Sequence, residues 1–141
     1  MDIILDFDGT CVTHDFPRVG KDIGAAPVLK ALVKKQHRLI LFTMRCDHDF
    51  TPSGEQPESD YPASNYLTDA INWFKQNDIP LYGINVNPTQ KAWTSSPKAF
   101  GHILIDDIAI GCPLIMDKRI SDKPFVNWAE IHNQLIELKI L

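Results

Sequence analysis

The sequence has no apolar run of the length that a membrane-spanning helix needs, which is about 20 residues. The apolar stretch Ile3 to Leu5 near the N-terminus ends at once in Asp6, so it does not resemble the hydrophobic region of a signal peptide. The three cysteines are odd in number and lack the spacing of a metal site, which indicates free thiols in a reducing compartment. These absences predict a cytoplasmic protein without membrane association.

An excess of positive charge is also missing, because the formal net charge at pH 7 is −4. Nucleic-acid-binding domains usually carry a basic patch, so nucleic-acid binding is not indicated, although a nucleotide or a nucleic-acid end stays open as a substrate. The chain has 141 residues, of which 44% are hydrophobic and 23% charged, which is the balance of a globular domain with a real core. We therefore expect one domain over residues 1–141.

Four short apolar runs bounded by polar residues have the character of buried strands. Segments with helical spacing of apolar residues alternate with them. Pro27 suits the first turn of the earliest helix, and Ser64 or Asn65 is placed to cap the second. This alternation predicts an α/β fold, a Rossmann-like three-layer α/β/α sandwich whose mainly parallel sheet is covered on both faces. The predicted strands are Ile3–Phe7, Arg38–Thr43, Leu81–Asn85 and His102–Ile105, and the predicted helices are Ala26–Gln36, Ser64–Asn77 and Phe125–Leu138.

The segment Cys46–Pro62 interrupts the alternation of strands and helices. It is rich in proline, serine, glycine and acidic residues, which is typical of a surface loop. Loops longer than about 12 residues in compact domains are often binding loops or lids. A surface insertion without function is an equal alternative from composition alone.

Acidic and polar side chains follow three of the predicted strands. Asp6 and Asp8 come at the end of the first strand, Thr43 at the end of the second, and Asp106 and Asp107 directly after the fourth. Ligands of open α/β sheets bind at the carboxyl ends of the strands. We therefore expect these side chains to converge at one edge of the sheet.

The grouped acids favour phosphate chemistry around a cation. Asp6 and Asp8 face the same side of an extended chain, and close carboxylates repel unless a cation lies between them. With Asp106 and Asp107 they form an oxygen-rich set that suits Mg²⁺. Lys98 and the threonine after the second strand would bind the other oxygens of a phosphate. A carboxylate can attack phosphorus directly, which predicts an aspartyl-phosphate intermediate.

These residues resemble the four motifs of the haloacid dehalogenase (HAD) superfamily of phosphatases. The string Ile4–Thr10 (ILDFDGT) is similar to the first motif, and Thr43 after Leu39–Phe42 resembles the second. Lys98 is similar to the third motif and Ile105–Asp107 to the fourth, all in family order. The resemblance implies a Mg²⁺-dependent hydrolase that cleaves phosphomonoesters.

The resemblance also assigns roles to single residues. It implies Asp6 as the nucleophile and Asp8 as the general acid/base. Asp107 is implied as a water-mediated partner of the metal or as a partner of Lys98. As the lysine of the third motif we prefer Lys98 over Lys91, because Lys98 lies closer to the fourth motif. The implied catalytic residues are Asp6, Asp8, Thr43 and Lys98, and the implied metal ligands are Asp6, the backbone carbonyl of Asp8, Asp106 and Asp107.

Members of this superfamily often carry a cap domain after the first motif or after the third strand. The corresponding gaps here, Cys11–Ala25 and Val86–Pro97, are too short for a folded cap. The resemblance therefore implies a capless enzyme. Such an enzyme acts on a phosphorylated small molecule or a phosphorylated macromolecule end, or shields its site by forming a homo-oligomer.

Residues beside the motifs are candidates for contact with the substrate. Arg45 would fork onto a phosphate or carboxylate, and a surface ion pair is the equal alternative. His14, Asp15 and Arg18 lie where a short flap should cover the site. The predicted substrate-binding residues are Gly9, Thr10, His14, Met44 and Arg45.

Two other functions stay open from the sequence. A receiver-like phosphoacceptor domain also combines an acidic pair with Asp, Thr and Lys on a parallel sheet. Such domains carry the acidic pair early, whereas here the paired acids Asp106 and Asp107 come last. A non-catalytic phosphate-binding or regulatory module on the same fold is the second alternative, and it would have no need of Asp8.

Overall fold

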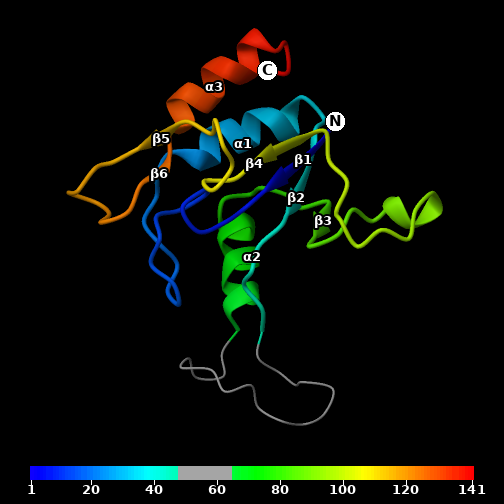
Figure 1. Ribbon diagram of the computed structural model, residues 1–141, viewed down its shortest axis with the longest axis horizontal. Helices are drawn as coiled ribbons and strands as arrows, with labels where there is room; N and C mark the ends of the chain where they lie inside the picture. Colours follow the sequence, from blue (N-terminus) through cyan, green and yellow to red (C-terminus); the bar gives the residue numbers. More distant parts are fainter. Residues whose placement is uncertain (48–64) are drawn as a thin grey trace.

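The protein is built around a four-stranded parallel sheet (Figure 1). The computed structural model describes residues 1–47 and 65–141. The strands are β1 (Asp2–Leu5), β2 (Arg38–Leu41), β3 (Gly83–Ile84) and β4 (Ile103–Ile105), in the spatial order β3-β2-β1-β4. The helices are α1 (Ala25–Lys34), α2 (Tyr66–Gln76) and α3 (Trp128–Glu137), with a 3-10 turn η1 (Gln90–Ala92). This is the Rossmann-like α/β fold that the sequence predicted, and no cap domain is evident in the described ranges.

β1 is the central strand and is buried along its whole length, because β2 and β4 flank it on either side. Leu5 pairs with Leu41 of β2 and with Ile105 of β4. All four predicted strands are confirmed, but β1, β2 and β3 end before their predicted carboxyl ends. β1 and β3 end directly before the polar residues Asp6 and Asn85, and β2 ends two residues before Thr43, so these side chains lie at the carboxyl edge of the sheet.

The three predicted helices are confirmed with small shifts at their ends. α1 follows Gly24, whose φ of 85° turns the chain into the helix, and α2 follows Asn65, which makes no side-chain cap bond. Among the described residues, no helix has the length and apolar character to cross a membrane.

The predicted start of the last helix at Phe125 is wrong. Phe125–Val126 forms β6 and pairs antiparallel with β5 (Leu114–Ile115), so α3 begins only at Trp128. The side chain of Asn127 accepts a hydrogen bond from the Glu130 N–H and fixes that start. The sequence missed this hairpin because two apolar residues before an amphipathic helix simply extend its apolar pattern.

The two faces of the sheet are covered differently. Side chains of all three helices join one core cluster, which includes Leu5 and Leu41. On the opposite face Ile4 and Ile40 pack against Ala99, which belongs to the connection between β3 and β4. Within the described residues this connection is extended apart from η1, so the second helical layer that the sequence predicted is absent there.

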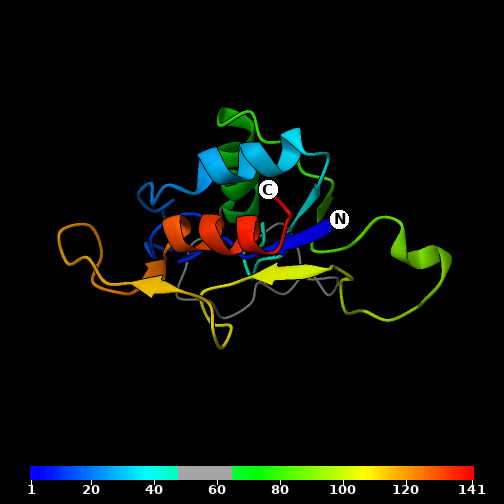
Figure 2. The ribbon, with the colours of Figure 1, turned by 90° about the horizontal axis from the view of Figure 1, so that it is seen from above.

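Two segments project from opposite ends of the sheet (Figures 1 and 2). The β5–β6 hairpin lies on the side toward which the parallel strands point, whereas the β3–β4 connection projects on the side of the N-terminus. Asn87 anchors that connection, because its Nδ2 donates to Asp2 Oδ2 at 2.9 Å and to the Phe100 carbonyl at 3.0 Å. The connection is therefore tied to the amino end of β1.

Substitution of Phe74 in α2 measures how strongly the helices stabilise the segment that carries the first motif. The Phe74 side chain is fully buried, with its ring centroid 6.1 Å from that of Phe7. We expect Phe74→Ala to lower the free energy of unfolding by about 3–5 kcal/mol, because a large cavity would open beside the core. Leu138→Ala, at a position 67% exposed, is the control and should change it by less than about 0.5 kcal/mol. Equal urea-unfolding midpoints for the two variants would contradict this packing role.

Candidate active site

The register of the sheet brings the first and fourth motifs together. The Asp6 N–H donates to the Ile105 carbonyl at 3.1 Å, so Asp6 follows β1 directly beside the end of β4. Carboxylate oxygens of Asp6, Asp106 and Asp107 lie within 4.8 Å of one another. We call these three residues the carboxylate cluster. Their convergence is the arrangement that the sequence led us to expect.

Thr10 links the first motif to Asp107 of the carboxylate cluster. Its buried hydroxyl accepts a hydrogen bond from the Asp107 N–H at 3.0 Å and lies 3.4 Å from Asp107 Oδ1. Its carbonyl accepts the indole N–H of Trp128 at 2.7 Å. Because Thr10 is completely buried, the prediction that it contacts the substrate is wrong, and its role is to position Asp107. Trp128 is a supporting residue that the sequence did not reveal, since it looked like ordinary packing.

His14 reaches the cluster from the flap loop, which we define as residues 11–24. His14 Nε2 lies 3.0 Å from Asp107 Oδ2. Gly9 makes this approach possible, because a Cβ built on it would lie 2.2 Å from His14 Nε2 and 2.8 Å from Asp107 Oδ2. The φ of Gly9 is also 84°, which side chains rarely adopt. Both predicted residues thus lie at the site, with Gly9 providing space.

The cluster carries more negative charge than its surroundings balance. Burial, together with the charges of Asp106 and Asp107, raises the pKa of Asp6 from 3.8 to about 7, against hydrogen bonds from the Phe7 N–H and Thr10 that lower it. A group in this state gains from a nearby cation.

The donor set fits a divalent metal ion. Three carboxylates offer hard oxygen atoms close enough together to share one ion, which is what Mg²⁺ prefers. Asp6, Asp106 and Asp107 are the residues that could hold it. The carboxylate of Asp8, by contrast, lies outside this cluster, and a metal-binding role of its backbone carbonyl stays a prediction.

Asp8 is held by a buried arginine. Arg45 Nε donates to Asp8 Oδ2 at 2.6 Å and Arg45 Nη2 to Asp8 Oδ1 at 2.7 Å, which is a bidentate ion pair. The Arg45 side chain is 1% exposed and that of Asp8 is 19% exposed. The pair fixes the Asp8 carboxylate in one orientation while leaving part of it open to solvent.

The other N–H groups of Arg45 bind backbone carbonyls. Nη2 donates to Arg18 O at 2.7 Å, and Nη1 donates to Pro17 O at 3.2 Å and to Tyr66 O at 3.5 Å. The guanidinium also lies near the rings of Phe7 and Phe16, 5.1 and 5.2 Å from their centroids. With all its donors used, Arg45 has none for a substrate, so the predicted substrate contact is wrong. The ion-pair alternative is found instead, in a buried form.

Thr43 follows the end of β2 by two residues. The Thr43 N–H donates to Asn85 Oδ1 at 2.8 Å, and Thr43 Oγ1 accepts from the Arg45 N–H at 3.2 Å. The hydroxyl proton is thereby left to donate. Asn85 is a second support that the sequence did not reveal, although an Asn after a strand, here with φ 54°, is a recognisable turn signal. Met44 is 96% exposed at the same edge.

Lys98 does not reach this edge, which corrects the third-motif assignment. It lies in the β3–β4 connection, where its carbonyl accepts a hydrogen bond from Gln90 Nε2. The chain then passes Phe100 and enters β4 through His102, whose N–H donates to the Asp2 carbonyl. Asp2 and Asp6 are roughly 13 Å apart along an extended strand. The alternative, Lys91, lies in η1 on the same projecting connection.

The long loop predicted at Cys46–Pro62 lies outside the described residues from position 48 onward. Its first residues are well anchored. Asp47 accepts hydrogen bonds from the Thr68 N–H at 2.9 Å and from the Thr68 hydroxyl at 2.6 Å. Asp47 therefore lies against the first turn of α2.

Comparison with known proteins gives one similar structure of interest. No protein-family model matches the chain, and no curated protein is similar to it. The solved structure of a conserved protein from Bacteroides thetaiotaomicron is 30% identical, with a TM-score of 0.67. The match covers 99% of this chain and 91% of that one.

The raised pKa of Asp6 predicts how stability depends on pH. Because the folded protein holds this proton more tightly than the unfolded chain, metal-free protein should lose stability as pH rises from about 4 to about 7, by at most about 1.4 kcal/mol per pH unit. Asp6→Asn cannot ionise and should lack this slope. Urea unfolding of both proteins in EDTA across this range measures the difference, and parallel pH curves would refute it.

The buried ion pair predicts a large effect for Arg45→Met. The Asp8 carboxylate and two carbonyls of the flap loop would lose their donors, so we expect the free energy of unfolding to fall by about 3–5 kcal/mol. Arg18→Met is the matched control, because Arg18 pairs with Asp15 at the surface with 78% of its side chain exposed. It should leave unfolding unchanged. Comparable losses for both arginines, measured by thermal unfolding, would show that Arg45 has no special structural role.

Proposed function

The chain belongs to the same family as the Bacteroides thetaiotaomicron conserved protein, and we propose that it is a Mg²⁺-dependent phosphomonoester hydrolase. The observation that carries this proposal is the carboxylate cluster at the carboxyl edge of the sheet, with Asp8 held two residues from Asp6. A nucleophile, a metal set and a fixed acid/base group are thereby available in one place. The substrate class is a phosphorylated small molecule or a phosphorylated macromolecule end.

The chemistry proceeds in two steps. In the first, a carboxylate oxygen of Asp6 attacks phosphorus, the bond to the leaving oxygen breaks, and that oxygen takes a proton from Asp8. In the second, Asp8 takes a proton from water, the water oxygen attacks the same phosphorus, and the bond to Asp6 breaks to release inorganic phosphate. Dividing the transfer in this way lowers each barrier.

Arg45 and Thr43 prepare the site for these steps. The Arg45 fork keeps the Asp8 carboxylate from rotating, so its two oxygens stay directed to fixed positions. The Thr43 hydroxyl, whose oxygen is held by the Arg45 N–H, is free to donate to a phosphate oxygen. Bound Mg²⁺ would supply the positive charge that screens Asp6 from the phosphate.

One observation favours a second candidate function. Because Lys98 lies at the opposite end of the sheet, no lysine of the described residues forms an ion pair with the carboxylate cluster. A module that binds a metal ion and phosphate without turnover would tolerate that loss. The two functions differ in whether phosphate is released from an ester.

Separate substitutions of the two aspartates test the proposed mechanism. Asp6→Asn should form no phosphoenzyme and show no turnover. Asp8→Asn should still form aspartyl-phosphate from a substrate with a good leaving group and then stall, with turnover reduced by about 10²–10⁴-fold. Rapid quenching with labelled phenyl phosphate, followed by hydroxylamine treatment, detects the acyl phosphate.

Glu137→Gln is the control for loss of a carboxylate, because Glu137 is exposed near the end of α3, and it should keep full activity. EDTA should abolish phosphate release by the wild type. Wild-type turnover in Asp6→Asn, or label on another residue, would overturn the nucleophile assignment. Metal binding by calorimetry without any phosphate release would support the binding module instead.

A further inference from the structure

A cavity of about 450 Å³ opens between the flap loop and the end of the β5–β6 hairpin. We call it the flap pocket. It is not part of the carboxylate cluster, but two of its lining residues, His14 and Asp15, are flap residues that the sequence marked as candidates for contact with the substrate. Its lining residues are His14, Asp15, Phe16, Ser121, Asp122 and Lys123.

His14 connects the flap pocket to the candidate active site. Its ring lines the pocket, while its Nε2 lies 3.0 Å from Asp107 Oδ2 in the cluster. Gly9 lies against the same ring, since a Cβ there would meet both His14 and Asp107. A group in the pocket would therefore be separated from the carboxylates by about the width of one imidazole. That is the position expected for the remainder of a molecule whose phosphate lies at Asp6.

The polar side chains of the pocket suit hydroxyl groups. Asp15 is oriented by Arg18, which donates to its two oxygens at 3.0 and 2.8 Å, yet each oxygen can accept a further hydrogen bond. Ser121 is 9% exposed, and its Oγ accepts the Lys123 N–H at 3.1 Å, which leaves the hydroxyl proton to donate. Carboxylates that accept from hydroxyl groups form strong, charge-assisted hydrogen bonds.

Phe16 adds an apolar wall to this polar pocket. Its ring is 41% exposed and is held edge-on by Tyr66, at a centroid distance of 5.0 Å. The negative face of an aromatic ring attracts the C–H groups on one side of a saturated, hydroxyl-bearing ring. A purely apolar leaving group would strip water from Asp15 and Asp122 without replacing it, and a second phosphate would be repelled by both.

We propose that the flap pocket binds the leaving group of the substrate and that this group carries vicinal hydroxyls, as a sugar or a ribose does. The inference rests on the proposed phosphatase function, and it narrows the substrate to a sugar phosphate or a nucleotide. Asp122 and Lys123 bind its hydroxyls from the hairpin side, Asp15 binds them from the flap side, and the ring of Phe16 packs against its C–H groups.

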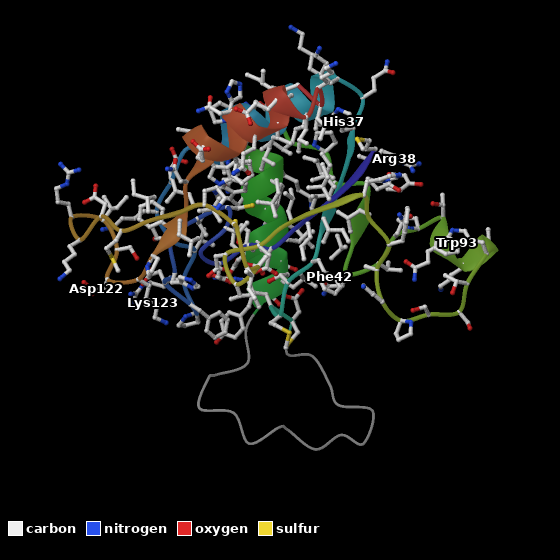
Figure 3. All side chains as sticks on the ribbon, turned by 45° about the horizontal axis from the view of Figure 1, so that its top comes forward. His37, Arg38, Phe42, Trp93, Asp122 and Lys123 are labelled. Atoms are coloured by element: carbon white, nitrogen blue, oxygen red, sulfur yellow. The ribbon has the colours of Figure 1, made fainter. Side chains whose placement is uncertain are left out.

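The pocket residues on the hairpin side can be substituted without disturbing the fold. Asp122 and Lys123 are exposed and lie next to each other at the end of the hairpin loop, on the opposite side of the molecule from Trp93 (Figure 3). Asp122→Asn and Lys123→Met should therefore fold normally. Lys118→Met is the matched control, because Lys118 belongs to the same hairpin loop but does not line the pocket.

The test compares steady-state kinetics on ribose 5-phosphate, adenosine 5′-monophosphate and phenyl phosphate in Mg²⁺. Asp122→Asn and Lys123→Met should each raise KM for a hydroxyl-bearing substrate by about tenfold, as expected for loss of one charge-assisted hydrogen bond. KM for phenyl phosphate and all values for Lys118→Met should stay within twofold of the wild type. A rise in KM for ribose 5-phosphate alone indicates that the substrate is a free sugar phosphate. A rise in KM for adenosine 5′-monophosphate indicates that the pocket binds the ribose of a nucleotide.

Two results would overturn the inference. One is an unchanged KM for both hydroxyl-bearing substrates, and the other is an equal rise for phenyl phosphate. If the wild type releases phosphate from none of the three esters, the proposed function fails, and calorimetric binding of ribose 5-phosphate decides the pocket separately. Binding that weakens in Asp122→Asn and Lys123→Met but not in Lys118→Met supports the flap pocket, and equal binding by all variants refutes it.

Discussion

The buried guanidinium of Arg45 is the interaction on which the geometry of the site depends. It joins three segments that are far apart in the sequence, because it binds the Asp8 carboxylate, the flap-loop carbonyls of Pro17 and Arg18, and the carbonyl of Tyr66 at the start of α2. A lysine could not make this set of contacts, since a single ammonium cannot form a planar fork. The position of the flap loop, and with it His14, follows from this one side chain.

The charge of the site is balanced unequally. Asp8 has a complete partner in Arg45, and Asp107 contacts His14, whereas Asp6 has only hydrogen bonds to oppose its burial and two like-charged neighbours. Among the described residues Asp6 and Asp106 form no ion pair with a cation, and Asp6 is the one that follows the central strand. Such an imbalance is costly to folding and is typical of positions kept for function rather than stability. It supports the proposed role of Asp6 as the nucleophile.

Strand periodicity and the grouping of acids sufficed to predict the parallel sheet and the meeting of Asp6 with Asp106, because register at a strand end depends on local pattern and pairing alone. Lys98 was misplaced because its position depends on whether the preceding connection folds as a helix. That connection is instead held by long-range hydrogen bonds, such as those of Asn87, which leave no periodic signal. The predicted substrate contact of Arg45 was wrong for a related reason. Arg45 is buried by the flap loop, which is distant in the sequence, and such burial leaves no local sequence pattern.

The β3–β4 connection and the carboxylate cluster lie at opposite ends of the parallel sheet, so the two ends of the molecule differ in character. Trp93, 62% exposed, lies on this projecting segment, away from the hairpin side of the molecule (Figure 3). Exposed loop tips of this kind accept inserted chain with little effect on the fold. A surface tether attached around Trp93 would hold the protein with its acidic edge facing solution. Molecules immobilised in this way would share one orientation toward their ligands.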